Sequence, residues 1–152
     1  MMGEGLGTPE DIAREEERKL QISKLFQELE LKPATAQREV EGQYTDTLAL
    51  MSERDSEGHL TPEAREALGI YNGMLQLQVD QYDDPEERMA GDVDMAVSMG
   101  RIEYVGGLTE SAHVAINDAF MAASYNDAYP AARLTKLEQL LDLLGGPIKE
   151  EY

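Results

Sequence analysis

The chain has 152 residues, which is the size of one compact domain. It carries 31 Asp and Glu against 13 Lys and Arg, and the resulting net charge of −18 disfavours direct binding to nucleic-acid phosphates and to anionic membranes. Because it has no Cys, it can form no disulfide, no thiolate zinc site and no cysteine nucleophile.

Helix-start signals recur along the sequence, in "TPED" at 8–11, "TPEA" at 61–64 and "DDPEE" at 83–87. In each, a Thr or Asp oxygen can cap an unpaired amide, and Pro needs no amide partner at the first helical position. The acids that follow favour the positive end of the helix dipole. These signals predict three helix starts, with Thr61 as the cap of the middle one.

Apolar spacing predicts the first two helices. One covers about 9–31, and its stripe, spaced i, i+3, i+4 and i+7, consists of Ile22, Leu25, Phe26 and Leu29. The next covers about 35–54, although Gly42 weakens its middle, and its apolar side consists of Val40, Tyr44, Leu48 and Met51. Each is expected to bury one face.

The third helix begins at Pro62, and two segments beyond it could be extended. "LQLQVDQY" alternates apolar and polar residues in the manner of a half-buried strand. Helix is favoured there, because no second alternating run is evident to pair with it and a lone strand leaves its backbone groups unpaired. "GRIEYVGG" is typical of a loop or a short extended piece. A short extended segment is therefore possible near 75–82 or 101–106.

Three more helices complete the pattern. The first covers about 85–99, the second begins after a cap at Thr109 and runs to about Tyr129, and the third covers about 131–144. In the last, leucines recur at spacings of three and four and predict a buried seam, within the bundle or against a neighbouring chain: Leu134, Leu137, Leu141 and Leu144.

Together these elements predict an all-α, single-domain bundle or array of about five to six amphipathic helices. This acidic helical domain would cover 9–144. A flexible N-terminal tail, 1–8, and a C-terminal tail, 145–152, would flank it.

A calcium loop is the first candidate site, because Asp55 and Glu57 precede a glycine in "RDSEGHL". With that glycine as the sixth position, the twelfth position, which should supply a bidentate Glu, is Ala64. A helix start capped by Thr61 accounts for the same residues. We therefore interpret the stretch as a seam between two helices, with Asp55 and Glu57 exposed and not organised for a cation.

A metal site is the second candidate. Glu110 and His113 have the Glu-x-x-His spacing that di-iron helical bundles use twice, together with two further carboxylates. Only one copy occurs, so a dimer would have to supply the second, and the simpler interpretation is a surface pair in the first turn of a helix. No cofactor is predicted, and this pair stays an alternative.

Three sets of residues could bind other protein chains. Methionine adapts to varied partners, so four methionines in adjoining helices predict either a partner groove or ordinary core: Met89, Met95, Met99 and Met121. An acid-rich stretch predicts an acidic surface: Asp80, Asp83, Asp84, Glu86, Glu87, Asp92 and Asp94. The leucine seam of 131–144 is the third set.

The sequence predicts a non-enzymatic protein that docks to other protein chains, because it has no Gly-rich phosphate loop and no nucleophile elbow. It would be an oligomer or a structural or accessory component of a larger assembly, such as a viral particle. An acidic decoy that blocks the basic surface of a nucleic-acid-binding protein is one alternative, and a metal-binding helical protein is another. The acidity could also be solubilising or a halophilic adaptation.

The expected location is the cytoplasm or an assembled particle. No apolar run approaches the roughly 20 residues of a membrane span. The N-terminal stretch does not have the basic start and apolar core of a secretory signal.

Overall fold

The computed structural model describes residues 8–34 and 44–149. Within these ranges the chain forms six helices and no strand, and residues 54 and 60 make one isolated antiparallel bridge. The helices are α1 (Pro9–Leu29), α3 (Tyr44–Met51), α4 (Pro62–Asp80), α5 (Pro85–Val105), α6 (Thr109–Ser124) and α7 (Ala131–Leu144). The predicted all-α, single-domain fold is confirmed.

The three predicted helix starts are confirmed as well. Thr8, Thr61 and Asp84 each accept a hydrogen bond from a backbone amide in the first turn, at 3.1, 3.1 and 3.0 Å. At Thr8 the cap is reciprocal, because Asp11 accepts from the Thr8 amide. Each cap supplies a partner to an amide that the helix itself leaves unpaired.

The two segments that could have been extended are helical. α4 continues to Asp80, which confirms the helix favoured for the alternating stretch. The segment after 99, expected to be a loop or a short extended piece, is instead the last part of α5, which continues to Val105. Leu75 and Val79 of α4 and Ile102 of α5 are buried in the second cluster, so their place in a helix rests on packing that the local pattern did not reveal.

Other boundaries also differ from the prediction. α1 ends at Leu29, α3 ends at Met51, and α6 ends at Ser124. Leu108, not Thr109, occupies the cap position of α6 and provides no side-chain hydrogen bond. The N-terminal part of the predicted second helix, 35–43, with Val40 and Gly42, lies outside the described residues.

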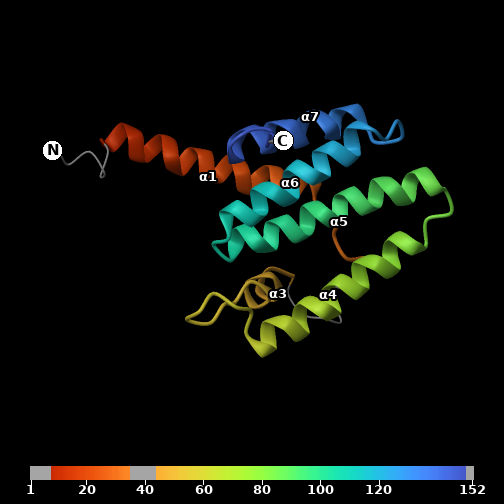
Figure 1. Ribbon diagram of the computed structural model, residues 1–152, viewed down its shortest axis with the longest axis horizontal. Coiled ribbons are helices and arrows are strands. Elements are labelled where there is room, and N and C mark those ends of the chain that lie inside the picture. The colour runs from red at the N-terminus through yellow and green to blue at the C-terminus, as the bar shows by residue number, and fades with distance from the viewer. Residues whose placement is uncertain (1–7, 35–43, 150–152) are drawn as a thin grey trace.

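Figure 1 shows two groups of helices on either side of α5. α6, α7 and the second half of α1 lie on one side, and α3 and α4 lie on the other. The first half of α1 projects away from the body, and Ile22 is the first side chain of α1 that is buried.

Each group has its own hydrophobic core. The first cluster joins α1, α5, α6, α7 and the turn before α7, and consists of Ile22, Phe26, Leu29, Val93, Val97, Ile116, Ala119, Ala123, Tyr129, Leu137, Leu140, Leu141 and Leu144. The second cluster joins the segment after α1 to α3, α4 and the other side of α5, and consists of Leu31, Leu48, Met51, Tyr71, Leu75, Val79 and Ile102. α5 is therefore the shared wall of two cores.

Candidate docking surface

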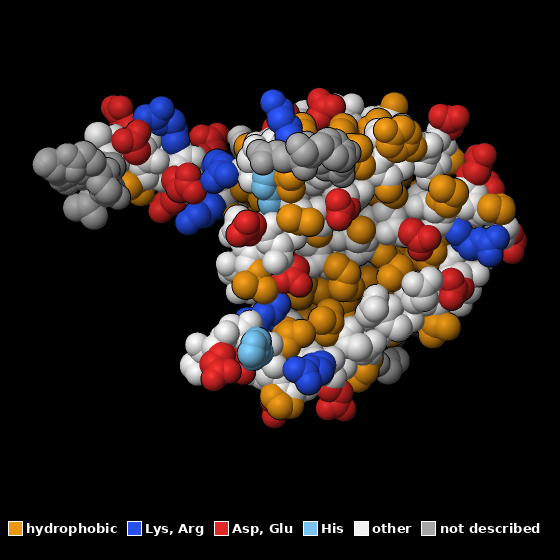
Figure 2. Space-filling model, viewed as in Figure 1, with side chains coloured by type: hydrophobic (Ala, Val, Ile, Leu, Met, Phe, Trp, Pro, Cys, Tyr) orange, Lys and Arg blue, Asp and Glu red, His pale blue; other side chains and the backbone are white. Residues whose placement is uncertain are grey.

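Two partly buried methionines of α5 pack against the second cluster, which α4 also helps to form. Met95 and Met99 are one turn apart and so share a face of α5. Both are half-buried against the second cluster, as is Leu68 of α4. Figure 2 shows a hollow between α5 and α4 in which hydrophobic side chains gather. The second cluster therefore leaves apolar surface open along this groove.

The other two methionines lie elsewhere. Met89, in the second turn of α5, is 55% exposed, and Met121, on α6, is 47% exposed. Neither packs against the second cluster. The structure thus brings together two of the four methionines singled out from the sequence.

The α4–α5 connection, next to the groove, is acidic. Six of the seven acids singled out from the sequence are exposed there: Asp80, Asp83, Asp84, Glu86, Glu87 and Asp92. Asp80 accepts from the Gln76 amide at 2.9 Å, and Asp84 caps α5. The remaining carboxylates point to solvent with Arg88 as the only exposed cation of that stretch.

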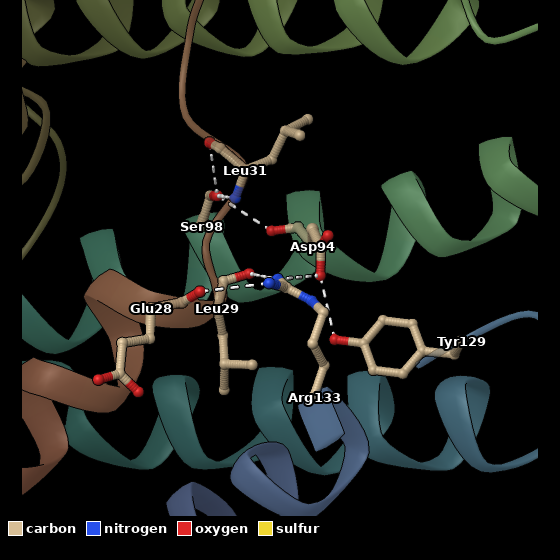
Figure 3. Close-up of polar contacts among 7 residues, drawn as sticks. All are labelled: Glu28, Leu29, Leu31, Asp94, Ser98, Tyr129 and Arg133. Carbon is tan, nitrogen blue, oxygen red and sulfur yellow. Dashed lines mark hydrogen bonds and ion pairs between the residues drawn. The ribbon is translucent and has the colours of Figure 1, made fainter. Parts of the chain in front are cut away.

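Asp94, the seventh acid, belongs to a partly buried polar junction of α1, α5 and α7 (Figure 3). Its Oδ1 accepts from Nη2 of Arg133 at 2.9 Å and from the Tyr129 hydroxyl at 3.0 Å. Arg133 also donates to the carbonyls of Leu29, at 2.7 Å, and Glu28, at 3.3 Å. These carbonyls have no partner within α1, because they belong to its last turn. Arg133 therefore ties the end of α1 to α5.

Charge and burial set the protonation of this junction. Burial raises the pKa of the Asp94 carboxyl above its ordinary value, although Arg133 acts in the opposite direction. Burial, with the Asp94 charge, raises the pKa of Tyr129 to about 12. Burial lowers the pKa of Arg133, but the charge and hydrogen bond of Asp94, together with Tyr129, raise it by more in total. At neutral pH both Tyr129 and Arg133 keep their protons and donate to Asp94.

Ser98 holds the segment that follows α1 to the same region of α5. Its hydroxyl accepts from the Leu31 amide at 2.9 Å and lies 3.2 Å from the Leu31 carbonyl and 3.0 Å from the Asp94 carbonyl (Figure 3). Ser98, Tyr129 and Arg133 were not predicted from the sequence. The one available signal was Arg133 in the first turn of a helix, where the dipole disfavours a cation.

The leucine seam lies inside the chain. Leu137, Leu141 and Leu144 are buried in the first cluster, and Leu134 is half-buried against it. Leu140, three residues after Leu137 and four before Leu144, is buried too, although it was not singled out from the sequence. α7 packs against α1 and α6, so the three buried leucines of the seam form core within the chain.

The seam between α3 and α4 is a tight loop. Oδ1 of Asp55 accepts from the amides of Glu57, at 2.8 Å, and His59, at 3.0 Å. These two hydrogen bonds, that of His59 first, lower the pKa of the Asp55 carboxyl. Asp55 and Glu57 are exposed, and Thr61 caps α4, as predicted. The Asp55 carboxylate is thus committed to backbone amides and holds the loop closed.

The two members of the Glu-x-x-His pair have different surroundings. Glu110 is exposed, whereas Nε2 of His113 lies 2.6 Å from the Gly146 carbonyl. Gly145 has φ of +134°, and a Cβ there would come within 2.8 Å of the His113 ring. His113 therefore packs under the segment that follows α7. The described residues contain no group of three His, Cys, Asp or Glu able to hold a metal ion.

Comparison with known proteins adds no relative. No family model matches the chain, and no match was found among curated proteins or solved structures. Among the described residues, no helix is long and apolar enough to cross a membrane.

Proposed function

We propose that this protein is a docking component of a larger protein assembly and that it binds a partner in the groove between α4 and α5. The observation that carries the proposal is the partly exposed apolar surface of that groove, with Met95 and Met99 on one wall. Contiguous exposed apolar surface is typical of interaction sites. Methionine suits such a site because its unbranched, flexible side chain adapts to the partner.

The partner that fits is an amphipathic helix of another protein, with basic residues beside its apolar stripe. A hollow between two helices suits the helix-in-groove mode of recognition. The exposed acids of the α4–α5 connection and the net charge of −18 favour a basic partner, which they would also steer toward the groove.

A second candidate function is the acidic decoy, which the six exposed acids of the α4–α5 connection favour. In that function the carboxylates carry the binding and the methionines contribute little. Affinity would then fall steeply as salt is added, because exposed charges are screened.

Binding of a fluorescent synthetic helix built from Leu and Lys tests the proposal. We expect the double variant Met95→Gln, Met99→Gln to weaken binding about tenfold, equivalent to about 1.4 kcal/mol, because the apolar contacts are lost. Met121→Gln is the matched control, since Met121 is exposed on another helix, and should bind as the unaltered protein does.

The acidic counterpart is the double variant Asp83→Asn, Glu87→Gln. If this variant abolishes binding while the methionine variant leaves it unchanged, the decoy replaces the groove as the function. Equal binding by all variants would contradict both. The same variants should then be used to capture partners from an extract of cells that make the protein.

A further inference from the structure

We infer that a pocket where the two helix groups meet binds a small phosphate monoester that carries a hydroxyl group. The pocket has a volume of about 610 Å³, and small-molecule sites commonly enclose roughly 300–1,000 Å³. Its wall comes from α1, the segment that follows α1, α4, α5 and α7. It is separate from the groove, since neither Met95 nor Met99 lines it. Its charged lining consists of Lys24, Glu28, Glu30, Lys32, Asp94 and Arg133.

The charges of this lining leave two lysines in surplus. Each of the three carboxylates already has a cation of the chain beside it. The pairs are Asp94–Arg133 at 2.9 Å, Glu28–Lys136 at 3.3 Å and Glu30–Arg101 at 2.5 Å. Lys24 and Lys32 are exposed and make no ion pair within residues 8–34 and 44–149. Two free ammonium groups match the charge of a phosphate monoester, which is close to −2 at neutral pH, and Lys binds phosphate well as a point charge.

The negative features around the pocket are compensated as well. Arg133 donates to the last carbonyls of α1, so the negative end of that helix has a cation in place (Figure 3). The net charge of −18 is spread over the chain, and exposed charges farther away than about 8 Å are largely screened at physiological salt. The local surplus of positive charge therefore decides which ligand the pocket favours.

Gln78 gives the wall a hydrogen-bond acceptor that lacks a donor. Its Nε2 donates to the Lys32 carbonyl at 3.0 Å, which fixes the orientation of the amide. Its Oε1 is buried, and no donor from the described part of the chain reaches it. A buried acceptor without a partner costs stability. Because Gln78 lines the pocket, a hydroxyl group of a bound ligand is the donor available to it, whereas an ionised phosphate group has none to offer.

The wall is formed before a ligand arrives. The segment that follows α1 is tied to α5 and α4 by three hydrogen bonds. They join Arg101 Nη1 to Glu30 Oε1 at 2.5 Å, the Leu31 amide to the Ser98 hydroxyl at 2.9 Å, and Gln78 Nε2 to the Lys32 carbonyl at 3.0 Å. Binding to such a wall requires little ordering of the chain, and this favours affinity.

Calorimetric titration of the full chain at neutral pH and physiological salt tests the site with three probes. Glycerol phosphate, which has both groups, should bind one molecule per chain. Methyl phosphate, which has the charge but no free hydroxyl, should bind about tenfold more weakly, and uncharged glycerol should not bind. Absence of binding by either phosphate ester at millimolar concentration would overturn the inference. Equal affinity for the two esters would overturn the role given to Gln78.

Variants locate the site. Lys24→Gln, Lys32→Gln should weaken glycerol phosphate binding at least about tenfold, because both surplus charges are lost. Lys19→Gln, Lys149→Gln is the matched control, since it changes the net charge equally at two exposed lysines that do not line the pocket. The control should bind as the unaltered protein does. Equal weakening by the two double variants would show an adventitious ion only and no site.

Gln78→Met tests the acceptor separately. This variant should bind glycerol phosphate and methyl phosphate alike, because the group that distinguishes them is gone. A melting temperature measured without ligand shows whether the variant is folded. A preference for glycerol phosphate that persists in the folded variant would contradict the assignment of Gln78.

Discussion

The first cluster is enclosed by α1, α5, α6 and α7, whereas the second is covered mainly by α3 and α4 and leaves methionines half-exposed along one edge. Both use α5, which gives Val93 and Val97 to the first and Ile102 to the second. The same helix therefore serves a large core on one side and a smaller one on the other. The difference indicates that most of the buried apolar surface, and so most of the stability, belongs to the first cluster, whereas Met95 and Met99 lie only partly buried at the edge of the second.

The largest expected effect is a loss of stability in the first cluster, and the comparison of the two clusters would be wrong if that loss were absent. Leu141→Ala should lower the free energy of unfolding by about 2–5 kcal/mol, because Leu141 is fully buried and its loss leaves a cavity. Met95→Ala should cost about 1 kcal/mol, since part of that side chain already lies in water. Urea unfolding measures both. Equal losses would mean that Met95 contributes as much to stability as the fully buried Leu141.

An intermediate effect is expected at the polar junction that joins α1, α5 and α7. Arg133→Met should cost about 1–3 kcal/mol, because Asp94 loses its charged donor and the last carbonyls of α1 lose their partner. Adding Asp94→Asn should recover part of this loss, because the uncompensated carboxylate is then gone. A double-mutant cycle measured by chemical unfolding gives the coupling. Strict additivity of the two changes would show that the ion pair does not hold the junction.

The smallest expected loss of stability is at the N-terminus of α4, the helix that helps to cover the second cluster. Thr61→Ala should cost about 0.5–2 kcal/mol, because the first turn of α4 loses its cap. Millimolar calcium should leave the melting temperature unchanged, since Asp55 already accepts from two backbone amides. Thermal melts with calcium and with chelator decide this. A rise with calcium that Asp55→Ala abolishes would restore the calcium loop.

The sequence by itself determined the helical class, the three helix starts and the buried faces. Caps at Thr8, Thr61 and Asp84 depend on the few residues that follow them, and the stripes of Ile22, Phe26 and Leu29 follow from the helical repeat. Such features need no knowledge of distant segments, because the physical interactions that produce them lie within one or two turns.

The tertiary structure alone decided how each stripe is used. The leucines of 134–144 and the methionines of 89–99 were both candidates for a partner surface, yet Leu137, Leu141 and Leu144 are core, and only Met95 and Met99 lie partly buried at the second cluster. In the sequence Asp94 cannot be told from the acids around it. In the structure it differs from them, because it pairs with Arg133, which lies far along the chain. Long-range packing decides both the burial of the leucines and the pairing of Asp94, because each depends on which helices contact one another. The spacing of residues within one helix does not indicate which helix will pack against it.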